Sequence, residues 1–209
     1  MDYSYESLMS LNGRDFGEST KRWDECVRTF WKGHSDRLYE FYVLPGILGI
    51  KGDSSLVEIG AEYYSKYIRS VLGITNGFFC LIDKKPKDHY DIRNVLNVDL
   101  FLSADLTSSI NFPIPTFDFV ISFGVLSHYD FSLTQCVTYV QNTLKMMKNQ
   151  GACAIKIDVQ VVQKIKDFKY YNSLLHIIES TFVVYNLDRL YDINHQLQFI
   201  VYYCKKKEA

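Results

Sequence analysis

The sequence predicts an α/β fold with a mostly parallel sheet, and three observations point to it. Short apolar runs end in an acid or a glycine, as at 56–60 and 77–83. Buried parallel strands read this way because both of their faces are covered. Helical patterns separate the first five runs. Two further runs, 181–185 and 198–204, follow each other directly near the end of the chain, which indicates an antiparallel hairpin.

Composition limits the class of protein. The 209 residues, 47% hydrophobic and 22% charged, suit one globular domain with a short appendage. A formal net charge of −1 gives no electrostatic argument for a nucleic-acid partner. We find no apolar run of membrane-spanning length and no signal-peptide pattern. The five cysteines form no CxxC pair and indicate buried free thiols, so we expect a cytoplasmic protein that contacts no membrane.

Residues 1–50 predict an N-terminal arm and a helical cap. Residues 1–17 are polar and indicate a loose arm. Apolar residues at helical spacing predict helices at 21–32 and 36–43, and Pro45 ends or kinks the second. The cap has two possible roles, as a structural cover of the domain edge or as a lid over a substrate pocket.

Residues 51–209 predict the α/β domain itself. Besides the runs already named, we expect strands at 99–104, 117–122 and 152–157 and helices at 64–72, 132–148 and 169–179, with a polar helix or irregular segment at 86–96. The sum is a Rossmann-like, doubly wound sheet of seven strands, mostly parallel with an antiparallel terminal hairpin. Such sheets bind ligands outside the carboxyl ends of their strands, where the strand order reverses.

The clearest local pattern is the segment from Phe117 to His128, FDFVISFGVLSH. A helix ending in a lysine-rich turn at 144–151 follows it, and the chain closes with the hairpin. In this order, residues 53–207 resemble the class I S-adenosylmethionine-dependent methyltransferases. The resemblance implies that the chain is an enzyme that transfers a methyl group from S-adenosyl-L-methionine.

The resemblance also implies cofactor-binding residues after the first two strands. Glu58 and Gly60 correspond to the first-strand motif, and Gly60 would pass close to the methionine part of the cofactor. Asp83, followed by Lys84, would accept hydrogen bonds from both ribose hydroxyls. Two alternatives remain open: Glu58 may bond loop amides instead, and Asp83 may be a solvated acid at a strand end.

Further cofactor contacts are implied after the third and fourth strands. Asp105 would accept a hydrogen bond from the adenine amino group, and Leu106 would pack on the ring. Ser122 and Phe123 would lie beside the cofactor. Alternatively, Asp105 caps the turn at 107–109.

The chain departs from the family pattern in the first loop. It reads Glu58-Ile59-Gly60-Ala61-Glu62-Tyr63-Tyr64, whereas the family has E/D-x-G-x-G-x-G. The missing glycines put side chains where the backbone would contact the cofactor. Either the loop adopts a different conformation that still binds the cofactor, or cofactor binding is weak or lost. The second case would make the chain a non-catalytic binding or assembly domain.

His128 is the candidate catalytic base, because it follows the fourth strand and its reference pKa of about 6.5 suits proton transfer. It could instead fix the loop by hydrogen bonding. The other histidines have no metal-ligand spacing, so we expect no metal. Lys156 resembles one member of the RNA ribose methyltransferase set, but Phe123 stands where that set has an acid, and we expect Lys156 to snorkel to solvent.

Net charge favours a small-molecule or sugar-type acceptor over nucleic acid. An RNA or protein acceptor is the alternative. The sequence does not predict an oligomeric state.

Overall fold

An eight-stranded sheet runs through the molecule in the order β1-β7-β8-β6-β5-β2-β3-β4. The computed structural model describes residues 1–11, 35–60, 72, 74–85, 98–110 and 113–207. The strands are β1 (Asp2–Tyr3), β2 (Ser55–Ile59), β3 (Phe78–Asp83), β4 (Leu100–Ser103), β5 (Phe117–Phe123), β6 (Met147–Asp158), β7 (Phe182–Tyr191) and β8 (Leu197–Lys206). All pairings are parallel except those of β8 with β6 and β7. The predicted fold class is confirmed, with one strand more than expected.

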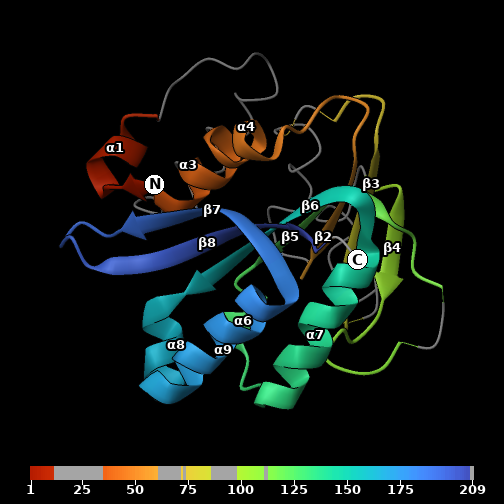
Figure 1. Cartoon of the computed structure of the whole chain (residues 1–209). Helices are drawn as coiled ribbons and strands as arrows, with labels where there is room; N and C mark the ends of the chain where they lie inside the picture. Colours follow the sequence, from red (N-terminus) through yellow and green to blue (C-terminus); the bar gives the residue numbers. More distant parts are fainter. Residues whose placement is uncertain (12–34, 61–71, 73, 86–97, 111–112, 208–209) are drawn as a thin grey trace.

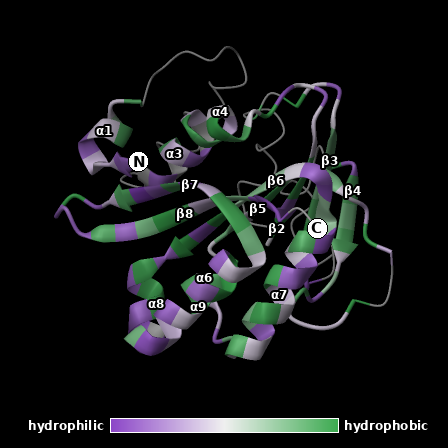
Figure 2. Ribbon diagram, viewed as in Figure 1, coloured by the Kyte–Doolittle hydropathy of each residue, from purple (hydrophilic) through white to green (hydrophobic). Residues whose placement is uncertain are grey.

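Helices cover both faces of the sheet (Figure 1). On one face lie α1 (Tyr5–Met9), α3 (Ser35–Tyr42) and α4 (Leu44–Leu48), and on the other α6 (Val125–His128), α7 (Leu133–Met146), α8 (Val159–Ile165) and α9 (Phe168–Thr181). Successive strand residues face opposite sides, so Leu56 packs into the first layer and Val57 into the second. Figure 2 shows largely hydrophobic strands between helices of mixed character. Within the described ranges, no helix has the length and apolarity needed to cross a membrane.

The additional strand comes from the segment predicted as a loose arm. Asp2 and Tyr3 pair in parallel with Arg189 and Leu190 of β7, and the Tyr3 ring meets the Tyr39 ring edge-on at 5.2 Å. A two-residue strand has no hydrophobic period, so sequence patterns do not reveal it. Residues 5–9 of that arm form α1, whose Leu8 side chain is buried. Residues 12–17, the helix predicted at 21–32, residues 64–71 of the helix predicted at 64–72 and the segment at 86–96 lie outside the described residues.

Two further differences lie in the second half of the chain. Residues 186–196, the polar segment between the runs at 181–185 and 198–204, are largely strand, because β7 continues to Tyr191 and a short turn follows. In that turn the Asp192 carboxylate accepts the backbone N–H groups of Asn194 and Gln196, both at 2.9 Å. Helix α8 was not predicted. It begins where the Asp158 carboxylate accepts the Val161 N–H at 2.9 Å.

Lys156, expected to snorkel to solvent, is buried at the end of β6. Its ammonium forms ion pairs with Asp36, at 2.8 Å, and with Glu40, both on α3. The expectation was wrong because α3 covers this strand end and supplies the two carboxylates. The ion pairs connect the N-terminal cap to the sheet.

Candidate functional site

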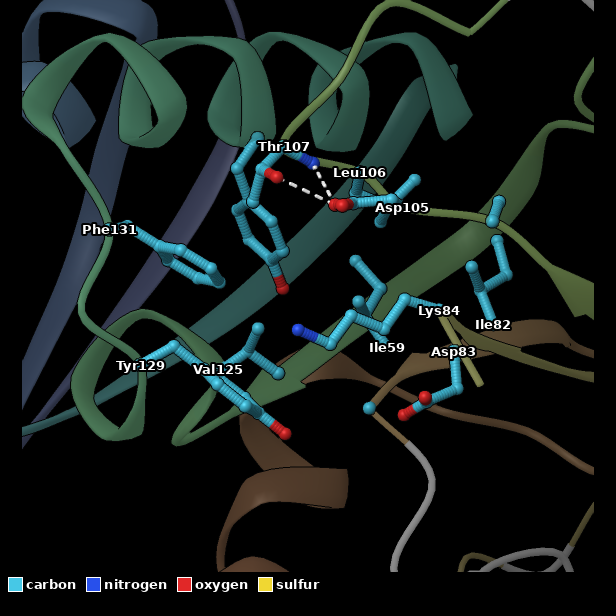
Figure 3. A pocket seen from close by; sticks show the side chains of 13 residues that line it. Ile59, Ile82, Asp83, Lys84, Asp105, Leu106, Thr107, Val125, Tyr129 and Phe131 are labelled. Atoms are coloured by element: carbon cyan, nitrogen blue, oxygen red, sulfur yellow. Dashed lines mark hydrogen bonds between the residues drawn. The ribbon is translucent and has the colours of Figure 1, made fainter. Parts of the chain in front are cut away.

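A pocket opens at the carboxyl ends of β2, β3 and β4, beside β5 (Figure 3). This is the point where strand order reverses, since β3 and β5 flank β2 on opposite sides. Its walls are Ile59, Gly60, Ile82, Asp83, Lys84, Ala104, Asp105, Leu106, Thr107, Val125, Tyr129, Phe131 and Tyr139. About 390 Å³ is free of protein atoms, a volume that includes the open mouth. A ligand of nucleotide size therefore needs the mouth as well as the enclosed part.

Gly60 forms the first turn of the pocket and cannot be replaced without strain. Its φ is +86°, and a Cβ there would lie 2.7 Å from Val125 Cγ2. Its N–H donates to the Ile82 carbonyl at 2.8 Å. The chain therefore leaves β2 in a left-handed conformation that brings its backbone against α6. Residues 61–64, which carry Glu62 and Tyr64 in place of the family's later glycines, lie outside the described residues.

Two acids follow neighbouring strands at the pocket. Asp83 ends β3, and its Oδ1 accepts the Lys85 N–H at 2.8 Å. Asp105 follows β4, and its Oδ1 accepts the Thr107 N–H at 2.9 Å and the Thr107 hydroxyl at 2.6 Å. The structure therefore contains the turn cap that was the alternative role of Asp105. This cap uses one carboxylate oxygen, so it is compatible with a ligand contact through the other.

A buried amide from α7 fixes the loop that carries Asp105. The Asn142 side chain, 1% exposed, donates to the carbonyls of Leu106 at 2.9 Å and Ser108 at 3.0 Å. Leu106 is buried and lies on the pocket wall. The protein's own hydrogen bonds thus fix the loop, as a preformed site requires.

The wall opposite the acids comes from α6 and the segment after it. Gly124, with φ +77°, begins α6, and its N–H donates to the Lys156 carbonyl at 3.2 Å. The buried Ser127 hydroxyl accepts the Asp158 N–H at 2.7 Å. These bonds attach α6 to β6. Tyr129 and Phe131 follow α6 with their rings stacked at 5.4 Å.

Lys84 crosses from the strand side of the pocket toward this aromatic wall. Its ammonium lies 4.9 Å from the centre of the Tyr129 ring. Figure 3 shows the side chain extended toward Val125 and Tyr129.

The structure brings five of the predicted cofactor residues together: Gly60, Asp83, Lys84, Asp105 and Leu106. Glu58 and Phe123 do not line this pocket. By strand alternation Glu58 shares the face of Leu56, and Phe123 packs on that same side, whereas the pocket walls belong to the other face.

Ser122 is on the pocket side but buried behind the wall. Its hydroxyl shares a 2.6 Å hydrogen bond with the Tyr139 hydroxyl, and burial raises the pKa of Tyr139. It therefore supports a lining residue. His128 is the last residue of α6, and its side chain lies outside the part of the chain that the structure describes.

The sequence did not predict several residues that line the pocket, namely Ile59, Ile82, Ala104, Thr107, Val125, Tyr129, Phe131 and Tyr139. The alternation of β2 and β3 was a usable signal for Ile59 and Ile82, which follow Val57 and Cys80 on the same face. No local pattern marks Tyr139, because its contact with β5 depends on how α7 packs.

No family model and no curated protein sequence matches this chain. Solved structures do. The N-methyltransferase NodS from Bradyrhizobium japonicum WM9, in complex with S-adenosyl-L-homocysteine, matches with a TM-score of 0.64 at 15% identity, covering 98% of both chains. A TehB-like SAM-dependent methyltransferase from Corynebacterium glutamicum matches with a TM-score of 0.60 at 12% identity, covering 90% of this chain and 96% of that one.

A third match is the fibrillarin pre-rRNA processing protein of Methanococcus jannaschii, with a TM-score of 0.52 at 16% identity, covering 77% of this chain and 69% of that one. At sequence identities of 12–16%, the similarity to these structures establishes a shared fold. The chain has the fold of the S-adenosylmethionine-dependent methyltransferases, and the predicted resemblance is confirmed at that level.

Proposed function

We propose that the chain is an S-adenosyl-L-methionine-dependent methyltransferase whose cofactor binds in this pocket. The observation that carries the proposal is the placement of Gly60, Asp83 and Asp105 after three successive strands at the point where strand order reverses. The fold shared with methyltransferases of known structure supports it.

The residues fit such a cofactor. The close packing at Gly60 leaves backbone, not side chain, facing the ligand, which suits the methionine part. The Asp83 carboxylate can accept hydrogen bonds from a vicinal diol, and Asp105 and Leu106 offer an acceptor and an apolar surface to the base. The bound cofactor supplies an electrophilic methyl group. The protein's contribution is to position the acceptor in line with it.

The acceptor is proposed to be a small molecule or a sugar-type metabolite, with His128 as the base that takes its proton. Support for His128 is its position at the end of α6, one residue before the pocket wall at Tyr129. RNA or protein is the competing acceptor. We also propose a cytoplasmic location, supported by the free, buried thiols of Cys80, Cys136, Cys153 and Cys204.

Calorimetry with S-adenosyl-L-methionine and S-adenosyl-L-homocysteine tests the proposal. We expect Asp83→Ala to weaken binding by about 1.5–3 kcal/mol, because it removes hydrogen bonds to a charged acceptor. Asp118→Asn is the matched control: it changes an acid at the opposite end of the strands and should leave affinity unchanged. A folded wild-type protein that binds neither ligand would refute the enzyme and favour the non-catalytic domain, to which the glycine-poor loop points.

A further inference from the structure

The pocket wall contains a buried hydroxyl, that of Tyr139, in addition to the acids and the glycine. We propose that this hydroxyl, oriented by Ser122, donates a hydrogen bond to the nucleoside part of the bound cofactor. The inference rests on the proposed function, because it concerns the same pocket and the same ligand.

Tyr139 is a polar group in a mostly apolar part of the wall. It is 1% exposed and lines the pocket beside apolar residues such as Ile82, Leu106 and Val125. Burial raises the pKa of Tyr139, so the phenol is neutral and keeps its hydrogen. A few polar groups on an apolar wall are what fix the orientation of a ligand in a pocket.

The hydrogen bond between Tyr139 and Ser122 leaves one hydrogen over. The two hydroxyl oxygens lie 2.6 Å apart, and among the described residues this is the one hydrogen bond that either hydroxyl makes. Each hydroxyl carries one hydrogen, and the shared bond uses only one of the two. One O–H of this buried pair therefore has no acceptor in the part of the chain that the structure describes.

The direction of the shared bond decides which hydrogen remains. If Tyr139 donated to Ser122, the Ser122 hydrogen would remain behind the wall, where a buried donor without an acceptor is costly. If Ser122 donates, the phenol hydrogen remains, on a residue that lines the pocket and can meet a ligand. Only the second arrangement satisfies both hydroxyls once a ligand is bound. Ser122 therefore donates to Tyr139, and Tyr139 donates to the ligand.

The position of Tyr139 favours the nucleoside part of the ligand. Asn142, one turn further along α7, holds the Leu106 carbonyl at 2.9 Å, so this stretch of the helix lies against the loop that carries Asp105. The Asp83 carboxylate also contributes to the raised pKa of Tyr139, which indicates that its charge reaches the hydroxyl. The two acids proposed to hold base and ribose thus lie on either side of the phenol's surroundings. Base nitrogens and ribose oxygens are acceptors for its hydrogen.

Titration calorimetry with S-adenosyl-L-homocysteine, alone and in competition with adenosine, tests the proposal. Tyr139→Phe removes the hydroxyl and keeps the ring. We expect it to weaken the binding of both ligands about three- to tenfold, as the loss of one hydrogen bond does, because adenosine contains the whole of the proposed contact.

Tyr202→Phe is the matched control. Tyr202 is also 1% exposed, its hydroxyl donates to Glu179 at 3.4 Å, and it does not line the pocket. We expect this variant to lose a buried hydroxyl while both affinities change by less than about twofold.

Ser122→Ala distinguishes the two directions of the shared bond. The phenol keeps its hydrogen for the ligand and loses only the group that orients it, so we expect a loss of affinity of at most about twofold. Tighter binding would show that Tyr139 donates to Ser122 in the free protein and would overturn the assignment. Circular dichroism establishes that each variant is folded.

Three further results would contradict the proposal. The first is an unchanged affinity for both ligands in folded Tyr139→Phe. The second is a loss for S-adenosyl-L-homocysteine but not for adenosine, or a wild type that binds only the former, since either would move the contact to the amino-acid part. The third is an equal loss in Tyr202→Phe, which would assign the effect to general destabilisation. A folded wild type that binds neither ligand refutes the proposed function itself, whereas the other outcomes refute this inference alone.

Discussion

The amino ends and the carboxyl ends of the strands differ in how their side chains are arranged. At the amino ends of β2 and β5, side chains bond to each other: Asp118 accepts the Ser55 N–H at 2.9 Å, the Ser55 hydroxyl at 2.6 Å and the Lys148 ammonium at 2.9 Å. At the carboxyl ends of β3 and β4, Asp83 and Asp105 face a pocket. The first arrangement ties the strands together, whereas the second places carboxylates on the wall of a cavity.

The carboxyl end of β6 does not face the pocket. Over β6 the edge is closed by Lys156 and its two carboxylate partners from α3. The Lys156 ammonium also lies 4.6 Å from the centre of the Phe199 ring. The carboxyl ends of the strands therefore have an open half, at β3 and β4, and a closed half, at β6 under the N-terminal cap.

The largest effect is expected at this closed half. Lys156→Met removes the ammonium that the buried carboxylates of Asp36 and Glu40 both contact, and breaking a buried ion pair costs about 3–5 kcal/mol. Lys148→Met is the control from the amino edge, where both partners are more than one third exposed, and should cost less than about 1 kcal/mol. Urea denaturation measures both. Equal losses would remove the distinction between the closed half and an ordinary surface pair.

A somewhat smaller loss is expected at the amino edge, from Gly77→Ala before β3. A Cβ there would lie 2.0 Å from the Ser54 carbonyl oxygen, a backbone atom that cannot move aside alone. Overpacking of this kind costs about 2–3 kcal/mol. Gly46→Ala, in α4 with nothing within 4 Å, should instead stabilise by about 0.5–1 kcal/mol. Thermal unfolding followed by circular dichroism would contradict the prediction if Gly77→Ala melted like the wild type.

The smallest effect is expected for Asp118→Asn. Burial alone would raise the pKa of Asp118, but hydrogen bonds from Ser55 and Lys148 hold it below its ordinary value. Since the folded pKa is depressed, its stabilisation is present above the unfolded value of about 3.9 and lost as pH falls through the folded pKa. For this partly exposed acid we expect at most about 1 kcal/mol. Unfolding free energies from pH 2 to 7 should converge for the two proteins at the acid end; a constant difference would contradict the assignment.

The parallel core of the fold was predictable because its strands are buried on both faces and read as apolar runs. The terminal hairpin was predictable for the same reason, although β7 extends into a segment too polar to be recognised. β1 was not, because its two residues carry no period and are ordered by pairing with Arg189 and Leu190, nearly the whole chain away.

Residues of the candidate site could be predicted from the sequence where their place at the end of a strand brings them to the pocket. Gly60, Asp83 and Asp105 follow strand ends, and parallel strands bring their ends together. Whether a residue near a strand end faces the pocket depends on alternation, which places Glu58 and Phe123 on the other side. Tyr129 and Phe131 reach the pocket through the path of the chain after α6, which no local pattern specifies.

The strand order also constrains the assembly of a growing chain. β8 lies between β6 and β7 although it follows both of them in the chain, and β1 must wait for β7. Until residues 197–206 have emerged, β6 is an unpaired edge of apolar residues, and unpaired edges attract other chains. The growing chain therefore carries this association-prone surface until β8 has been made, and the hairpin of β7 and β8 then covers it.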